Sequence, residues 1–231
     1  MSLGLAGLDK TTDVASALAG RLHPAMRVLV GGFGERGFPF TLNHALLEAA
    51  VGGLHLVKSD GNEDGLGIGL LIEAGLVARV TASHVGLNRG LVERVNTGAV
   101  ELEMVPQGIL AERIRAGGAG LGGVLSDVGI GTLIAEGKSP VCVDGAEYVV
   151  EPAIRGDLAL IRAARADRFG NLVYRNAARN FNPLMAMAAD YVVVEAEEII
   201  ATGELDPNEV HTPGVFVDAV VPVDPAVEAA A

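Results

Sequence analysis

A glycine-rich stretch near the start of the chain is the part of this sequence best suited to binding chemistry. Residues 28–30 are Val-Leu-Val, an apolar run that suits a buried strand and is too short for a helix. Glycine lets backbone N–H groups approach a ligand without a Cβ in the way, and four glycines follow the run, at Gly31, Gly32, Gly34 and Gly37. A helix capped by Thr41 is expected next. The stretch could therefore hold an anionic or nucleotide-like group at a helix N-terminus.

The glycine spacing does not by itself identify a ligand. It approaches the G-x-G-x-x-G pattern, but Phe33 and Phe38 flank the glycines, and no G-x-x-x-x-G-K-[ST] motif occurs. A tight strand-to-helix turn without a ligand would need similar glycines. The loop alone leaves a binding site and a structural turn as alternatives.

Polar residues also follow three later runs that are typical of strands. They are Ser59-Asp60 after residues 54–57, Ser83-His84 near the end of residues 78–85, and Pro106-Gln107-Gly108 after residues 100–105. The carboxyl ends of parallel strands meet at one edge of an open sheet, where ligands collect. We therefore expect these loops to gather beside the glycine loop.

The strands alternate with apolar patterns of helical period. Helices are expected over residues 11–22, 41–49, 65–75, 91–95, 108–115 and 182–189. Alternation of this kind predicts parallel strands joined by right-handed crossovers. The predicted fold class is α/β, with a single open, mostly parallel sheet and helices on both faces.

The pattern changes after the fifth of these helices. Residues 117–131 contain seven glycines but are apolar, which favours an ordered loop packed near the site over a flexible linker. A hairpin turning at Asp144-Gly145 is predicted next. Residues 158–161 and 171–174 resemble another pair of strands. This part of the chain is expected to add a mixed-β hairpin section.

The last part of the chain predicts one helix and two strands. Asn182 is expected to cap the helix, and the strands are expected at 191–195 and 215–221. Since no convincing linker interrupts the sequence, residues 1–222 are expected to form one domain. Residues 223–231 are expected to be a frayed tail.

Composition argues against several classes of protein. The chain has 231 residues, half of them hydrophobic, and a net charge of −12, which argues against a broad nucleic-acid or anionic-membrane surface. Cys142 is the single cysteine, so neither an internal disulfide nor a cysteine-rich metal site is expected. No stretch has a secretory or membrane-spanning pattern. We expect a cytoplasmic protein without a metal, a nucleic-acid partner or a membrane partner.

Longer motifs, taken together, resemble one family. In chain order they are Val30-Gly-Gly-Phe-Gly34 with Gly37 and Pro39, Val105-Pro-Gln-Gly-Ile-Leu-Ala-Glu-Arg-Ile-Arg-Ala-Gly-Gly-Ala-Gly120, Gly129-x-Gly-Thr132, Ala178-Arg-Asn-Phe-Asn-Pro183, and Gly203-Glu-Leu-Asp-Pro207 before His211-Thr-Pro-Gly214. Over about residues 14–221 the sequence resembles the alpha subunit of family I CoA-transferases of the 3-oxoacid (acetate or acetoacetate) type. The resemblance implies an α/β fold shared with sugar-phosphate isomerases.

The resemblance implies transfer of CoA between a short-chain acyl-CoA and a carboxylate. In this family a glutamate carboxylate of the beta subunit is the nucleophile, and CoA is a substrate and product with no permanently bound cofactor. This chain would then need a beta subunit, in a hetero-oligomer such as α2β2 or larger. Glu35 is an alternative nucleophile, but a solvated loop glutamate is the commoner case.

The resemblance also implies roles for particular residues. The CoA-lining residues would be Gly31, Gly32, Phe33, Gly34, Glu35, Arg36 and Gly37. Gln107 matches a glutamine that points toward the reacting carbonyl, where an amide can stabilise an oxyanion; otherwise it caps the helix after Pro106. Ser59 and Asp60 match a polar pair that contacts the substrate region; otherwise they form a hydrogen-bonded turn.

Other polar residues fit structural roles better. His84 is expected to be structural or to lie at a subunit contact rather than to act as a base. Arg179 is expected to be a buried ion-pair partner rather than an anion anchor. Ser126-Asp127-Val128 stands where the family commonly has Thr-Pro-Thr, which leaves the preferred acyl group open.

A non-catalytic protein of the same fold is the alternative function. Such a protein would bind a sugar phosphate or CoA as a regulator, because fold alone does not determine function. Titration with CoA and with sugar phosphates would separate the two interpretations.

Overall fold

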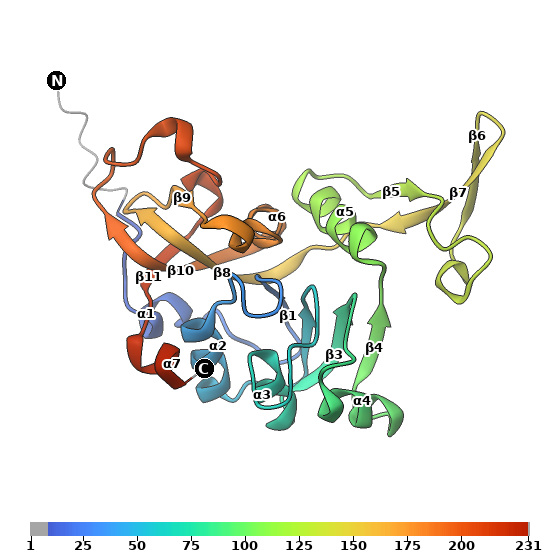
Figure 1. Ribbon diagram of the computed structural model, residues 1–231, viewed down its shortest axis with the longest axis horizontal. Helices are drawn as coiled ribbons and strands as arrows, with labels where there is room; N and C mark the ends of the chain where they lie inside the picture. Colours follow the sequence, from blue (N-terminus) through green and yellow to red (C-terminus); the bar gives the residue numbers. More distant parts are fainter. Residues whose placement is uncertain (1–8, 231) are drawn as a thin grey trace.

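The computed structural model describes residues 9–230 (Figure 1). Its α-helices are α1 (Val14–Leu18), α2 (Phe40–Ala49), α3 (Ile68–Glu73), α4 (Arg89–Asn96), α5 (Gln107–Gly118), α6 (Asn182–Met187) and α7 (Pro225–Ala230). Its strands are β1 (Arg27–Val30), β2 (Leu54–Val57), β3 (Val77–Ala82), β4 (Glu101–Met104), β5 (Gly123–Ser126), β6 (Pro140–Val143), β7 (Ala146–Pro152), β8 (Gly156–Asp167), β9 (Leu172–Val173), β10 (Ala189–Ile200) and β11 (Ala219–Pro222). Within this described range, no helix has both the length and the apolar character needed to span a bilayer.

The main sheet is open and almost entirely parallel. Its strand order is β11-β10-β8-β1-β2-β3-β4, and every neighbouring pair along this path is parallel. The short strand β9 pairs antiparallel with β8. The predicted α/β class with a mostly parallel open sheet is confirmed.

Both faces of this sheet are buried under helices. Successive strand residues point to opposite sides, so neighbouring residues of one strand enter different cores. Val28 and Val30 of β1 pack in a core with helices α1 to α4, whereas Leu29 packs in a second core with α5 and α6. All three side chains are fully buried. Burial on both faces explains why the strands are continuous apolar runs, and it confirms the predicted helices on both sides.

A second, smaller sheet projects beyond α5, away from the main sheet (Figure 1). It is antiparallel, in the order β5-β7-β6. Asp144 and Gly145 have φ values of 51° and 81°, as the predicted two-residue hairpin turn requires. The expectation that residues 117–131 pack near the site is wrong, because they run into this projecting sheet and leave Leu125 47% exposed.

The strand pair predicted from residues 158–161 and 171–174 is present as β8 and β9, but residues 158–161 are not the part of β8 that faces β9. Residues 158–160 pair parallel with β1 on one side and with β10 on the other. The antiparallel contact with β9 lies further along β8, at Arg165 and Ala166. A short apolar run shows that a strand is buried but does not show which strands flank it.

The end of the chain also differs from the frayed tail that was expected. Residues 225–230 form α7, which lies against α2. The N–H of Asp224 donates to Oγ1 of Thr41 at 2.9 Å, and the Glu228 carboxylate forms an ion pair with Arg162. These polar contacts hold the segment on the domain. They also occupy the Thr41 hydroxyl, which does not cap α2 as predicted.

Candidate functional site

The loop after β1 is a small hairpin with its tip at the surface. The N–H of Phe33 donates to the carbonyl of Arg36 at 3.1 Å, and the N–H of Arg36 donates back at 3.0 Å. Gly34, at the turn, has φ 55°, in the left-handed region that favours glycine. Phe33 is 50% exposed, and Glu35 and Arg36 line the pockets beside the tip.

Most of the loop glycines are required by the protein itself. A Cβ at Gly31 would overlap the amide oxygen of Asn182, and one at Gly37 would lie 2.8 Å from the amide nitrogen of the same side chain. A Cβ at Gly32 would lie 2.9 Å from backbone atoms on the far side of the loop. Around Gly34 the space is open. Of these four glycines, only Gly34 leaves open space in which a ligand could approach the backbone.

The N-terminus of α2 is not free to hold an anionic ligand, contrary to the sequence-based expectation. The N–H of Leu42 donates to Oε2 of Glu195 at 3.0 Å. Glu195 is fully buried, and burial raises its pKa to about 7 despite this N–H and the nearby Arg162 guanidinium. A carboxylate of β10 thus takes the place at the helix end that a ligand anion would occupy.

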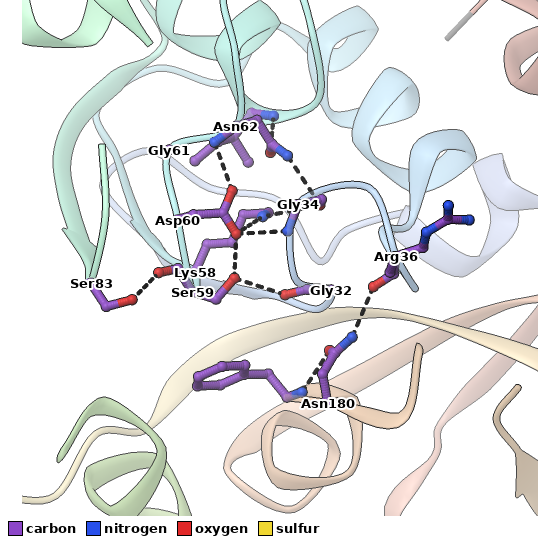
Figure 2. A network of polar contacts seen from close by, with 12 residues as sticks. Gly32, Gly34, Arg36, Lys58, Ser59, Asp60, Gly61, Asn62, Ser83 and Asn180 are labelled. Carbon is purple, nitrogen blue, oxygen red and sulfur yellow. Dashed lines mark hydrogen bonds and ion pairs between the residues drawn. The ribbon is translucent and has the colours of Figure 1, made fainter. Parts of the chain in front are cut away.

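Residues of the loop after β2 hold the tip of the glycine loop (Figure 2). Oδ2 of Asp60 accepts hydrogen bonds from the N–H of Gly34 at 2.8 Å and from Nζ of Lys58 at 2.9 Å. The carbonyl of Gly34 accepts from Nδ2 of Asn62 at 3.1 Å and from Nζ of Lys58 at 3.4 Å. Both polar groups of the Gly34 residue are therefore used inside the protein.

The Lys58–Asp60 ion pair keeps this contact charged. Burial lowers the pKa of Lys58, which is fully buried, while Asp60 acts in the opposite direction. Burial would raise the pKa of Asp60, but the Lys58 ammonium, the Ser59 hydroxyl and the Gly34 N–H together hold it below its ordinary value. Asp60 is therefore ionised at neutral pH, with Lys58 as its counter-ion.

Ser59 supports the loop from inside. Its side chain is fully buried, and its hydroxyl donates to the carbonyl of Gly32 at 3.0 Å and contacts Asp60. The N–H of Asn62 donates to Oδ1 of Asp60 at 2.9 Å, which is the hydrogen-bonded turn that the sequence offered as an alternative. The buried hydroxyl favours that alternative for Ser59. The Asp60 side chain is 14% exposed, and its contact with a substrate stays a prediction.

Two asparagines hold the other side of the loop. Nδ2 of Asn180 donates to the carbonyl of Arg36 at 2.8 Å (Figure 2). Nδ2 of Asn182 donates to the carbonyl of Gly37 at 3.1 Å, and its Oδ1 accepts from the N–H of Arg162 at 3.2 Å. Asn182 is the first residue of α6 and is fully buried, so it ties the loop down rather than capping the helix as predicted.

The exposed tip of the loop lies between two pockets. One has a volume of about 390 Å³ and is lined by Glu35 and Arg36 together with residues of β8, β10 and the segment before α6. The other, of about 200 Å³, lies between the same tip and the loop after β2, including Asp60. An exposed, firmly held loop beside two pockets is what a ligand site requires.

Gln107 lies at the same edge of the sheet but apart from this group. It is exposed at the first position of α5, and within residues 9–230 its side-chain amide makes no hydrogen bond, so it does not cap the helix. β4 is three strands from β1, roughly 14 Å at the usual strand spacing. The structure thus brings Ser59 and Asp60 to the glycine loop and leaves the Gln107 amide free and separate.

One further expectation from the sequence is wrong, and another stays untested. Arg179 is exposed, and the ion pairs found between residues 9 and 230 do not include it, so it is not a buried partner holding α6. His84 is also exposed, and its role in the structure or at a subunit contact rather than as a base stays a prediction. In the same described range, no three His, Cys, Asp or Glu side chains form a group able to hold a metal ion.

Sequence reasoning missed the side chains that hold the loop. Lys58 and Asn62 flank the predicted polar pair, and Asn180 and Asn182 stand in the Ala-Arg-Asn-Phe-Asn-Pro motif. Lys58 and Asn62 follow the end of a strand, and that position in the sequence could have indicated that they lie near the site. The asparagines lie more than a hundred residues from the loop, so no local pattern points to their partners.

A parallel open sheet with an exposed, polar-supported loop at the carboxyl edge is the architecture of α/β proteins that bind small ligands at the sheet edge. Comparison with protein families narrows the class. The family model described as Coenzyme A transferase matches residues 11–222. The chain belongs to the coenzyme A transferase family, as an alpha subunit of family I.

Individual relatives agree with this assignment. The chain is 44% identical to the subunit designated A of the succinyl-CoA:3-ketoacid coenzyme A transferase of Xanthomonas campestris pv. campestris (strain B100), over 94% of this chain and 89% of that protein. It is 46% identical to the acetate CoA-transferase subunit alpha of Escherichia coli (strain K12), over 87% of this chain and 92% of that protein.

A solved structure shows the same fold in a longer chain. The acyl-CoA transferase YdiF of Escherichia coli O157:H7, as apoenzyme, superposes with a TM-score of 0.84 at 25% identity. The match covers 95% of this chain and 47% of that protein, so this chain spans about half its length. The chain is thus equivalent in fold to one part of a larger transferase.

Proposed function

We propose that this chain is the alpha half of a heteromeric CoA-transferase that works with a companion beta subunit. It moves CoA from a short-chain acyl-CoA, of acetyl, succinyl or acetoacetyl type, to a carboxylate. The names of the relatives support the proposal, because both denote one subunit of a transferase, and the substrates they name are succinyl-CoA, a 3-ketoacid and acetate.

The reaction needs a carboxylate nucleophile, which we place on the companion subunit. That glutamate attacks the thioester carbonyl and the C–S bond breaks. CoA leaves as the thiolate, and a mixed anhydride of the acyl group and the glutamate remains. The thiolate then attacks the glutamyl carbonyl of the anhydride and releases the first carboxylate, leaving a glutamyl-CoA thioester. The second carboxylate substrate attacks this thioester, and the same two steps in reverse form the new acyl-CoA.

The residues of this chain bind and orient. The single observation that carries the proposal is the glycine loop, which presents Phe33, Glu35 and Arg36 beside two pockets while its backbone is held from both sides. A loop fixed before binding loses little entropy when the thioester binds. The free amide of Gln107 is suited to donate to a developing oxyanion.

Glu35 is a poor candidate for the nucleophile on the geometry. It is exposed at the loop tip, and within residues 9–230 its carboxylate makes no hydrogen bond or ion pair that would orient it toward a thioester. We assign it to the surface of the site rather than to covalent catalysis.

Reconstitution tests the proposal. The purified chain alone should show no transfer between succinyl-CoA and acetoacetate, and adding a beta subunit should restore it. Replacing the nucleophilic glutamate of the beta subunit by glutamine should abolish the restored activity. Turnover by this chain alone, or tight binding of sugar phosphates with no transferase activity in the pair, would contradict the proposal.

A further inference from the structure

Arg36 carries a charge that the described part of the protein does not neutralise. Its side chain is exposed at the tip of the glycine loop, and none of the ion pairs formed among residues 9–230 includes it. Its sequence neighbour Glu35 is not paired with it either. A guanidinium offers several donors in a planar fork that matches carboxylate and phosphate oxygens.

The neighbouring arginines are already matched by carboxylates. Arg175 is paired with Glu197 at 3.0 Å. Arg162 is paired with three carboxylates, those of Glu195, Glu197 and Glu228. Of the three arginines that line the larger pocket, Arg36 is therefore the one whose charge remains available to a ligand.

The backbone of Arg36 is fixed although its side chain is free. Phe33 exchanges two backbone hydrogen bonds with it, and Asn180 donates to its carbonyl at 2.8 Å. Figure 2 shows the guanidinium extending away from Asp60, so it is not drawn into the Lys58–Asp60 contact. Because the backbone that carries this guanidinium is held in place, the cation can select a ligand group by where that group lies in the site.

The place of Arg36 lets it reach a ligand in either pocket. It lines both the pocket of about 390 Å³ and the pocket of about 200 Å³. The chain as a whole has a net charge of −12, which repels anions at long range. A local unpaired cation at the mouth of the site offsets that repulsion where an anionic substrate enters.

We propose that the guanidinium of Arg36 binds an anionic group of the acyl-CoA substrate. The inference rests on the proposed CoA-transferase function. The group is a planar or tetrahedral oxyanion with two oxygens for the fork. It comes either from the free carboxylate of a dicarboxylic acyl group such as succinyl, or from a phosphate of the CoA nucleotide.

The test compares four thioester donors in the reconstituted enzyme. They are succinyl-CoA, acetyl-CoA, succinyl-pantetheine and acetyl-pantetheine, each assayed for kcat/KM with acetoacetate as acceptor. The variants are Arg36→Ala and Arg36→Lys, and Arg21→Ala is the control. Arg21 is also exposed, but it lies beyond α1 with its guanidinium over the ring of Tyr191. Thermal unfolding of each variant checks that the chain remains folded.

Arg36→Ala should lower kcat/KM about tenfold for donors that carry the recognised anion, which is the size of one lost charge-assisted hydrogen bond. The loss should appear mainly in KM, and Arg36→Lys should recover part of it. A loss with both succinyl donors identifies the carboxylate, and a loss with both CoA donors identifies a phosphate. An equal loss with all four donors, or no loss, overturns the proposal.

Failure of this inference is distinct from failure of the proposed function. If the wild-type chain and the beta subunit together transfer CoA but Arg36→Ala changes no donor selectively, only the role of Arg36 is wrong. If the wild-type pair transfers nothing, the proposed function is wrong and the Arg36 inference falls with it.

Discussion

Removing Lys58 should uncover how much the ion pair under the glycine loop contributes to stability. In Lys58→Met the Asp60 carboxylate keeps the N–H donors of Gly34 and Asn62 and its contact with the Ser59 hydroxyl, but loses its counter-ion. Breaking a buried ion pair by removing one partner costs about 3–5 kcal/mol. Since Asp60 keeps those donors and is 14% exposed, we expect about 3 kcal/mol, at the low end of that range.

A double-mutant cycle separates this coupling from lost packing. Asp60→Asn alone leaves the ammonium of Lys58 buried without a carboxylate, and should also cost about 3 kcal/mol. In the double variant Lys58→Met/Asp60→Asn no buried charge remains, and the amide oxygen can still accept from the N–H of Gly34. The double variant should therefore lose about 3 kcal/mol rather than the additive value of about 6 kcal/mol.

Urea unfolding of the four chains at pH 7, followed by circular dichroism, measures the cycle. The folded-state pKa of Asp60 lies below its ordinary value of 3.8. Its contribution to stability is therefore complete above the unfolded-state pKa and is lost only as the pH falls through the lower folded-state value. At pH 7 the contribution of the ionised Asp60 is complete. Additivity of the two single variants to within about 0.5 kcal/mol would refute the reasoning.

The remaining predictions concern three other parts of the site. The pKa of Glu195, raised from 4.5 to about 7, means that folding takes up a proton, so the unfolding free energy should fall by about 3 kcal/mol as the pH rises from about 4.5 to about 7. Unfolding free energies measured across this pH range should show the decrease in wild type. If Glu195→Gln shows the same decrease, Glu195 is not its cause. Gly31→Ala should abolish soluble folding, because its Cβ overlaps Asn182, whereas Gly34→Ala should fold with a loss of about 1 kcal/mol from its positive φ; equal melting temperatures for the two variants would contradict this. Gln107→Ala should lower kcat of the reconstituted enzyme about a hundredfold and leave the melting temperature of the exposed position unchanged; an unchanged kcat would remove Gln107 from catalysis.

Local patterns in the sequence predict most of the main sheet. Val28, Leu29 and Val30 form a run that is apolar on both faces, and the structure buries both faces. The polar residues after β2 can be placed at the carboxyl edge because parallel strands share that edge. These inferences need only periodicity, strand polarity and the rule for crossovers.

Contacts between distant parts of the chain could not be predicted in the same way. Asn182 reaches Gly37 across 145 positions, and neither residue has a local pattern that names the other. The same limit explains why the partners of residues 158–161 could not be predicted, because β8 is 12 residues long and pairs with different strands along its length. The β6–β7 hairpin of the projecting sheet was predicted, but its third strand, β5, was missed, because the apolar residues of this glycine-rich segment resemble those of a packed loop although Leu125 is exposed.

The sequence also predicted an anion-binding helix end that the structure does not leave open. A glycine loop before a helix normally offers backbone N–H groups to an anion. Here the N–H of Gly34 is bound to Asp60 and the N–H of Leu42 is bound to Glu195, so two internal carboxylates already use those donors. With these two donors in use, we expect a side chain to recognise an anionic substrate at this loop. Arg36 has the charge, the exposure and the fixed backbone that this task requires.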